Sequence, residues 1–186
     1  TALVAAGVLT LADALPLVRL RAQAMQDAVP VGTGGMAAIL GMDAEEVRQH
    51  CLKVAQESGE VVEAVNFNDP KQTVIAGSNE AMKRVAERIK GNGFAKRLAV
   101  SVPSHCPLLE QPAQALFQAF VPLKAPRITY LSSTRARPIH NPEQLRDDLA
   151  FNMCRVVDWR GTVQSAYERG VRLQIELPPG AVLTGL

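Results

Sequence analysis

Apolar residues recur along the chain with two different periods, which predicts alternating helices and strands. From Leu11 to Ala28 they recur every three to four positions, while Asp13 lies early and Arg19 and Arg21 lie on the polar side. This spacing is typical of an amphipathic helix. Elsewhere short apolar runs bounded by Gly, Pro, Asn and Asp indicate strands.

Residues 36–99 predict a compact unit of their own. After a Gly-rich turn at residues 30–35, the pattern predicts strands at 36–41, 61–68, 72–77 and 96–100 and helices at about 44–58 and 80–91. Asp43 and Ser78 are the expected N-caps of the two helices. The order βαββαβ is that of a ferredoxin-like subdomain, and we interpret it as an insert.

The remaining residues, 1–35 and 100–186, predict a larger α/β domain. Beyond the first helix they contain predicted helices at about 108–120, 142–152 and 161–170 and predicted strands at 128–131 and 173–177. Helices that alternate with short apolar strands favour a layered α/β structure with a largely parallel sheet.

Composition excludes some classes of partner. The chain has 186 residues, 47% apolar and 20% charged, and 20 basic against 18 acidic residues give a net charge of +2. Such a balance gives no single-sign field for nucleic acid or anionic membranes, so we expect neither as a partner. Cys51, Cys106 and Cys154 are odd in number and far apart, which predicts neither a disulfide framework nor a metal site and favours the cytoplasm.

The start of the chain is typical of the middle of a domain. Its most apolar run, Ala2 to Leu9, is much shorter than the roughly 20 residues that span a bilayer, and no basic stretch precedes it. We therefore expect the true N-terminus to lie upstream.

His105 and Arg21 are the candidates for chemistry. His105 lies in Ser101-Val-Pro-Ser-His-Cys-Pro, between a predicted strand and a predicted helix, where catalytic groups concentrate. A structural role for a lone histidine stays open. Arg21 offers a guanidinium that holds a carboxylate through two hydrogen bonds, but a surface ion pair is the alternative, with Arg19 beside it.

Other motifs are weaker. The chain contains no G-x-S-x-G nucleophile elbow, and Gly32-Thr-Gly-Gly lacks the Lys-Ser/Thr of a phosphate loop. The amide-rich stretch 66–72 either closes a hairpin or lines a polar cleft. Pro178-Pro-Gly180 predicts a tight turn able to border a pocket.

Six blocks, in order, resemble the malonyl-CoA:acyl carrier protein transacylase family, and the likeness covers essentially the whole chain. Ala2-Leu-Val-Ala-Ala-Gly-Val-Leu resembles the helix after that family's GHSxGE elbow, and Arg21-Ala-Gln-Ala-Met-Gln resembles its substrate-arginine helix. The other blocks are Val65-Asn-Phe-Asn-Asp-Pro, Val74-Ile-Ala-Gly, Val102-Pro-Ser-His-Cys and Pro179-Gly-Ala-Val-Leu-Thr-Gly-Leu186.

The resemblance implies a hydrolase-like α/β domain with a ferredoxin-like insert, and it implies roles for four residues. His105 would be the general base and acid, and Arg21 would hold the malonyl carboxylate. Asn152 would orient the histidine through its backbone carbonyl, where many members have Gln, and Met25 would line the acyl pocket. Asn66 and Asn68 have no implied role.

The implied reaction is ping-pong acyl transfer from malonyl-CoA to the phosphopantetheine thiol of an acyl carrier protein. It implies no permanently bound cofactor, and we expect a monomer. The elbow serine should lie a few residues before Thr1 and is not in the sequence.

Two alternatives remain open. Tyr130-Leu-Ser-Ser-Thr-Arg-Ala-Arg137 and Leu177-Pro-Pro-Gly180 are closer to the malonyltransferase subunit of malonate decarboxylase, which charges a different carrier protein. The other alternative is a catalytically dead module that binds a carrier protein without turnover.

Overall fold

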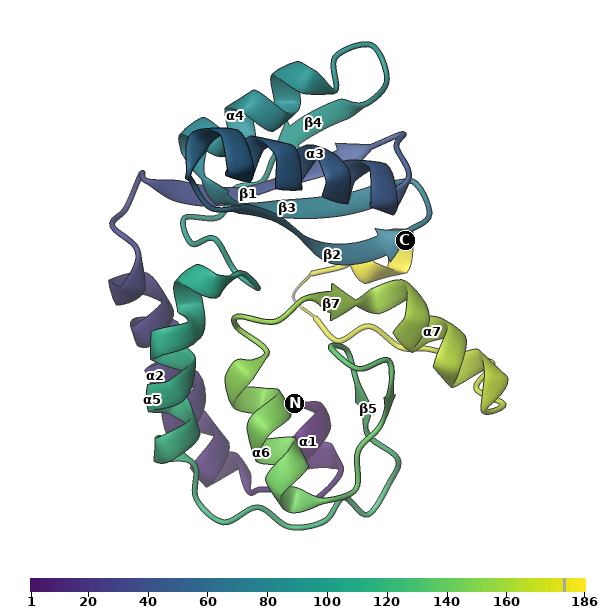
Figure 1. The fold of residues 1–186 in the computed structure, drawn as a ribbon. Coiled ribbons are helices and arrows are strands. Elements are labelled where there is room, and N and C mark those ends of the chain that lie inside the picture. Colours follow the sequence, from purple (N-terminus) through teal and green to yellow (C-terminus); the bar gives the residue numbers. More distant parts are fainter. Residues whose placement is uncertain (179) are drawn as a thin grey trace.

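The computed structural model describes residues 1–178 and 180–186. Figure 1 shows a sheet with two helices on its upper face. Below the sheet lies a group of helices, which includes the N-terminal helices and helices from the middle of the chain. The predicted turn at residues 178–180 includes Pro179, which lies outside the described residues.

The main sheet has five strands in the order β4-β1-β3-β2-β7. Their bounds are β1 Gly34–Leu40, β2 Val62–Asp69, β3 Gln72–Ser78, β4 Phe94–Arg97 and β7 Val157–Asp158. Strands β4, β1, β3 and β2 pair antiparallel, whereas β7 joins β2 in parallel, with Asn66 opposite Val157. The first four strands and the helices α3 (Ala44–Ser58) and α4 (Asn79–Arg88) follow the chain order βαββαβ. The exact division at residues 35/36 and 99/100 stays a prediction.

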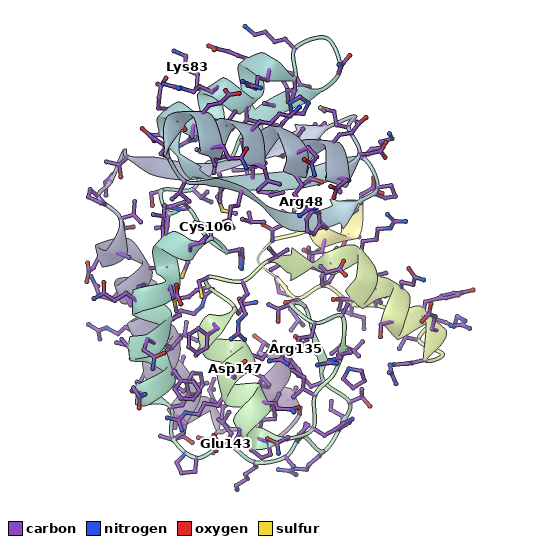
Figure 2. All side chains as sticks on the ribbon, in the orientation of Figure 1. Arg48, Lys83, Cys106, Arg135, Glu143 and Asp147 are labelled. Atoms are coloured by element: carbon purple, nitrogen blue, oxygen red, sulfur yellow. The ribbon has the colours of Figure 1, made fainter. Side chains whose placement is uncertain are left out.

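Both faces of the sheet are covered. Successive side chains of a strand point to opposite sides, so each strand packs against a different group of residues on each face. In β1, Ala37 and Ile39 pack with α3 and α4, while Met36 and Ala38 pack with Cys106 on the other face. Figure 2 shows Cys106 in the segment between α5 and the sheet. The segment after β4 is therefore fixed against the lower face of the sheet.

The helical part lies below this face (Figure 1). It contains α1 (Ala2–Ala5), α2 (Leu11–Ala28), the 3-10 helix η1 (Pro107–Leu109), α5 (Glu110–Ala119), α6 (Pro142–Phe151) and α7 (Trp159–Glu168). Helix α5 packs between α2 and α6 around a cluster that includes Met25, Leu109, Leu116 and Met153. In the part of the chain that the structure describes, no helix has the length and apolarity needed to cross a bilayer.

Several predicted elements differ from the observed ones. The predicted strand at residues 173–177 is wrong: it has no described strand partner, and Leu173 and Ile175 are each 77% exposed. The strand expected at 128–131 is reduced to β5 (Leu131–Ser132), which pairs only with β6 (Arg137–Pro138). Among the named strands, parallel pairing is confined to β2 and β7, and β7 was not predicted.

The apolar stripe of α2 is only partly covered. Met25 is buried, whereas Leu15 and Val18 are exposed because no described residues pack over that side of the helix. The helix nevertheless has the predicted bounds, since Thr10 caps it by accepting a hydrogen bond from the backbone N–H of Asp13.

Candidate active site

The backbone holds His105 in an unusual conformation. Its φ of 65° is in the left-handed region that non-glycine residues rarely adopt. Its N–H donates to the carbonyl of Met153 at 2.7 Å, and its neighbours Pro103 and Cys106 are buried. Such strain is of order 1–3 kcal/mol and persists only where the surroundings impose it, which is common at functional sites.

The imidazole ring of His105 is oriented by Asn152, the residue that follows α6. Nδ1 lies 2.7 Å from the carbonyl oxygen of Asn152. Because a carbonyl can only accept, Nδ1 carries the proton, and in the neutral ring Nε2 keeps its lone pair. His105 is therefore held in the tautomer that a general base needs.

The charge state of His105 suits the same role. Burial is the largest influence and lowers the pKa of His105, and the positive charge of Arg21 lowers it further, while hydrogen bonding to the backbone of Asn152 and Arg155 acts in the opposite direction. The net shift is downward from 6.5. The ring is therefore neutral at neutral pH.

Arg21 reaches the same residue from α2. Its Nη2 donates to the side-chain Oδ1 of Asn152 at 3.5 Å. The side chain is half-buried, and burial lowers its pKa, although an arginine still remains protonated at neutral pH. Among the described residues no carboxylate forms an ion pair with Arg21, so the alternative of a surface ion pair is wrong. The neighbouring Arg19 is exposed.

A cavity of about 310 Å³ lies beside these groups. Arg21 and Asn152 are part of its wall, and Thr1 lies in the same wall. Most of the rest is apolar, and the main apolar side chains are Leu3, Val4, Leu9, Leu17, Val18, Leu116, Phe120 and Leu149. His105 contacts Asn152 but is not one of the described lining residues. Tyr130, Ser133 and Asp148 also border the cavity, so it combines the Arg21 cation, the Asn152 amide and one carboxylate with a largely apolar wall.

Met25 is separated from this cavity. It lies one turn after Arg21 on α2, is 9% exposed, and packs with Val29, Leu109 and Met153. It is not among the described residues that line the cavity. Its predicted place in the acyl pocket stays a prediction.

A buried carboxylate that the sequence did not single out anchors the helix carrying Asn152. Asp148 is 2% exposed and accepts a hydrogen bond from Ser132 Oγ at 2.7 Å and another from Thr134 Oγ1. Its backbone carbonyl accepts the N–H of Asn152 at 2.9 Å. The only sequence signal is its position one helical turn before Asn152, together with hydroxyl residues at 132–134.

The neighbouring Asp147 forms a second, more exposed cluster. Arg135 donates to it at 2.8 Å and Arg155 at 3.0 Å, and these hydrogen bonds lower the pKa of Asp147. Figure 2 shows Arg135 and Asp147 close together beside α6. Both clusters connect the segment between β5 and β6 to α6, the helix that precedes Asn152.

The cysteines are not suited to act as nucleophiles. Burial raises the pKa of Cys106 to about 11 and that of Cys51 to about 12, and it also raises the pKa of Cys154. All of them are therefore thiols rather than thiolates at neutral pH. Within the described residues, no group of three His, Cys, Asp or Glu side chains could hold a metal ion.

Comparison with known proteins shows which family the chain belongs to. A malonyl CoA-acyl carrier protein transacylase of Escherichia coli (strain K12) is 42% identical, with 100% of this chain and 61% of the relative covered. One from Haemophilus influenzae is 43% identical, with 100% and 60% covered. The chain therefore spans about 61% of the length of such curated relatives.

Solved structures agree. A malonyl-CoA:acyl carrier protein transacylase from Xanthomonas oryzae superposes with a TM-score of 0.94 at 40% identity, over 99% of this chain and 59% of that one. A malonyl-transacylase in complex with its type II PKS acyl-carrier protein gives a TM-score of 0.92 at 39% identity, over 99% and 60%. These matches confirm the predicted hydrolase-like α/β fold class. The family model of the acyl transferase domain matches residues 1–186, and the chain belongs to this family.

Proposed function

We propose that the full-length protein transfers a malonyl group from CoA to the phosphopantetheine thiol of an acyl carrier protein by a ping-pong mechanism. One observation carries the proposal. Asn152 contacts both a half-buried arginine that has no carboxylate partner among the described residues and a neutral histidine with a free Nε2. Arg21, a cation available to bind a carboxylate, is thus held next to His105, a general base.

In this proposal His105 moves the protons. Nε2 removes the proton of a nucleophilic hydroxyl as its oxygen attacks the malonyl thioester. As the C–S bond breaks, the resulting imidazolium gives that proton to the departing CoA thiolate. In the second half-reaction the ring deprotonates the incoming phosphopantetheine thiol and returns the proton to the hydroxyl. The carbonyl of Asn152 keeps the ring aimed in both directions and stabilises the imidazolium.

Arg21 provides the selectivity for malonyl. The malonyl carboxylate supplies a bidentate acceptor for the guanidinium, whereas an acetyl group leaves this half-buried cation unpaired. A site built for a polar group rejects an analogue that lacks it more strongly than an apolar site rejects a change in size. We therefore assign Arg21 the discrimination between malonyl-CoA and acetyl-CoA.

The nucleophile in this proposal is a serine outside these 186 residues. The cysteines are protonated at neutral pH, so they do not supply it. Thr1 lines the cavity together with Arg21 and Asn152. The free cysteines are further consistent with a cytoplasmic protein.

The acceptor is tested by transfer. The full-length protein is loaded with malonyl-CoA, freed of excess ester, and mixed with a carrier protein that either carries or lacks phosphopantetheine. Malonyl should move only to the phosphopantetheine form, as detected by the intact mass of the carrier. Carriers of fatty acid synthesis and of malonate decarboxylase are compared side by side, because faster transfer to the latter would favour the alternative malonyltransferase. Loss of CoA without transfer to any carrier would contradict the proposal.

A further inference from the structure

Asn152 contacts the two predicted functional groups through two different atoms. Its main-chain oxygen lies 2.7 Å from Nδ1 of His105, and its side-chain oxygen lies 3.5 Å from Nη2 of Arg21. The first contact depends only on the backbone, whereas the second depends on the amide. A substitution at this position therefore separates the two contacts.

The amide is an unusually weak partner for a half-buried guanidinium. Two other partly buried arginines, Arg135 and Arg155, have a carboxylate partner, because they reach Asp147 at 2.8 and 3.0 Å, and Arg97 donates to the carbonyl of Gly34 at 3.2 Å. Charge-assisted hydrogen bonds are typically about 2.7–2.9 Å long and roughly twice as strong as neutral ones. At 3.5 Å the bond from Arg21 to Asn152 lies at the limit of hydrogen bonding.

We propose that the Asn152 side chain is a placeholder acceptor for Arg21 and thereby determines substrate specificity. In the empty site the amide oxygen holds the guanidinium toward the cavity, and it gives way to the stronger carboxylate of the incoming acyl group. The inference rests on the proposed function, since it names a specificity determinant of that same site.

The neutrality of the side chain is essential to this role. Asparagine and aspartate have nearly the same shape, but an aspartate at position 152 would supply the guanidinium with a permanent carboxylate. A malonyl group would then have to displace an ion pair and bring a second negative charge next to the first. An acetyl group needs neither step. Whether residue 152 carries an amide or a carboxylate therefore determines which acyl group Arg21 accepts.

The test compares two substitutions in the full-length protein, Asn152→Asp and Asn152→Ala. Both keep the backbone carbonyl that holds His105. The rates of acyl-enzyme formation from malonyl-CoA and from acetyl-CoA are measured by rapid quench and intact mass. We expect the malonyl-to-acetyl rate ratio to be highest in the unsubstituted protein, at least twofold lower in Asn152→Ala, and at least tenfold lower again in Asn152→Asp. Equal ratios in the two variants would overturn the inference, because a merely structural role would lower both rates alike.

Asn92→Asp is the matched charge control. It adds the same charge in the exposed turn between α4 and β4, far from the cavity, and should leave the malonyl-to-acetyl ratio within twofold of the unsubstituted protein. If it lowers the ratio as much as Asn152→Asp does, net charge explains the effect and the placeholder role is refuted.

A second measurement, of the melting temperature, needs no turnover and separates the proposed function from the placeholder role of Asn152. Free malonate should raise the melting temperature of the unsubstituted protein most, that of Asn152→Ala less and that of Asn152→Asp least, with acetate as the comparison ligand. If the unsubstituted protein forms no acyl-enzyme yet shows this pattern, the proposed function fails and the placeholder role stands. If it forms the acyl-enzyme and malonate protects all three proteins equally, only the placeholder role fails.

Discussion

Substituting Asp148 by alanine should strongly destabilise the protein, because its carboxylate is the buried centre of a polar cluster. Ser132 Oγ donates to it at 2.7 Å and Thr134 Oγ1 donates to the same oxygen, while Arg135 Nε lies 3.6 Å away. The residue is 2% exposed, so its carboxylate is largely shielded from water. The two hydroxyls would lose their acceptor, whereas Arg135 would keep its ion pair with Asp147.

The expected cost follows from these contacts. Leaving a buried donor without its acceptor costs about 1–3 kcal/mol, and two hydroxyls donate to Asp148. We therefore expect Asp148→Ala to lower the free energy of unfolding by about 2–5 kcal/mol. Asp148→Asn keeps one acceptor oxygen and should cost about 1–3 kcal/mol. Either loss is a large share of the roughly 5–15 kcal/mol that stabilises a typical domain.

Urea unfolding of the full-length protein, followed by circular dichroism, measures this directly. The midpoint should fall while the slope of free energy against urea stays the same. Asp147→Ala is the control: this carboxylate is 31% exposed, and its ion pairs should be worth only about 1 kcal/mol or less. A loss below about 1 kcal/mol for Asp148→Ala, or equal losses for both variants, would refute the reasoning.

Three further predictions concern His105 and Met25. The rate of acyl-enzyme formation should fall as the pH drops, with a midpoint below 6.5, because burial and Arg21 lower the pKa of His105. Arg21→Met should move that midpoint upward. An unmoved midpoint would exclude the charge of Arg21 as a cause of the lowered pKa. The same shift means that the unfolded chain binds the His105 proton more readily, so stability from this group is fully present above 6.5 and declines as the pH falls toward the folded pKa. Met25→Ala should cost about 2–5 kcal/mol in urea unfolding, since it leaves a cavity among Val29, Leu109 and Met153. A changed malonyl-to-acetyl ratio with little loss of stability would instead place Met25 in the acyl pocket.

Local signals were sufficient for most helices. Thr10 and Ser78 accept the backbone hydrogen bonds that open α2 and α4, and a cap together with a helical apolar period is readable in a short stretch of sequence. Asp43 lies at the predicted N-cap position of α3, but its carboxylate pairs with Lys71 instead of capping the helix. That partner lies in the hairpin turn between β2 and β3 and could not be read from local sequence.

Strands and the site depend on partners distant in sequence. The apolar alternation at 173–177 is typical of a strand, yet no described strand pairs with it, while β7 consists of only two residues and exists because β2 lies beside it. Arg21 and Asn152 are 131 positions apart, so their contact has no local signature. His105 could be nominated from its place between a strand and a helix, but the hydrogen bond that fixes its tautomer could not.

The central claim is that Arg21 admits a malonyl group to a site served by His105. The most direct test is the intact mass of the full-length protein after brief exposure to malonyl-CoA or acetyl-CoA, with Arg21→Ala and the exposed neighbour Arg19→Ala as matched variants. The account predicts a malonyl adduct in the unsubstituted protein and in Arg19→Ala, and a large loss of it in Arg21→Ala with relative gain of acetyl. Equal malonyl adducts in Arg21→Ala and Arg19→Ala, or no adduct in the unsubstituted full-length protein, would contradict it.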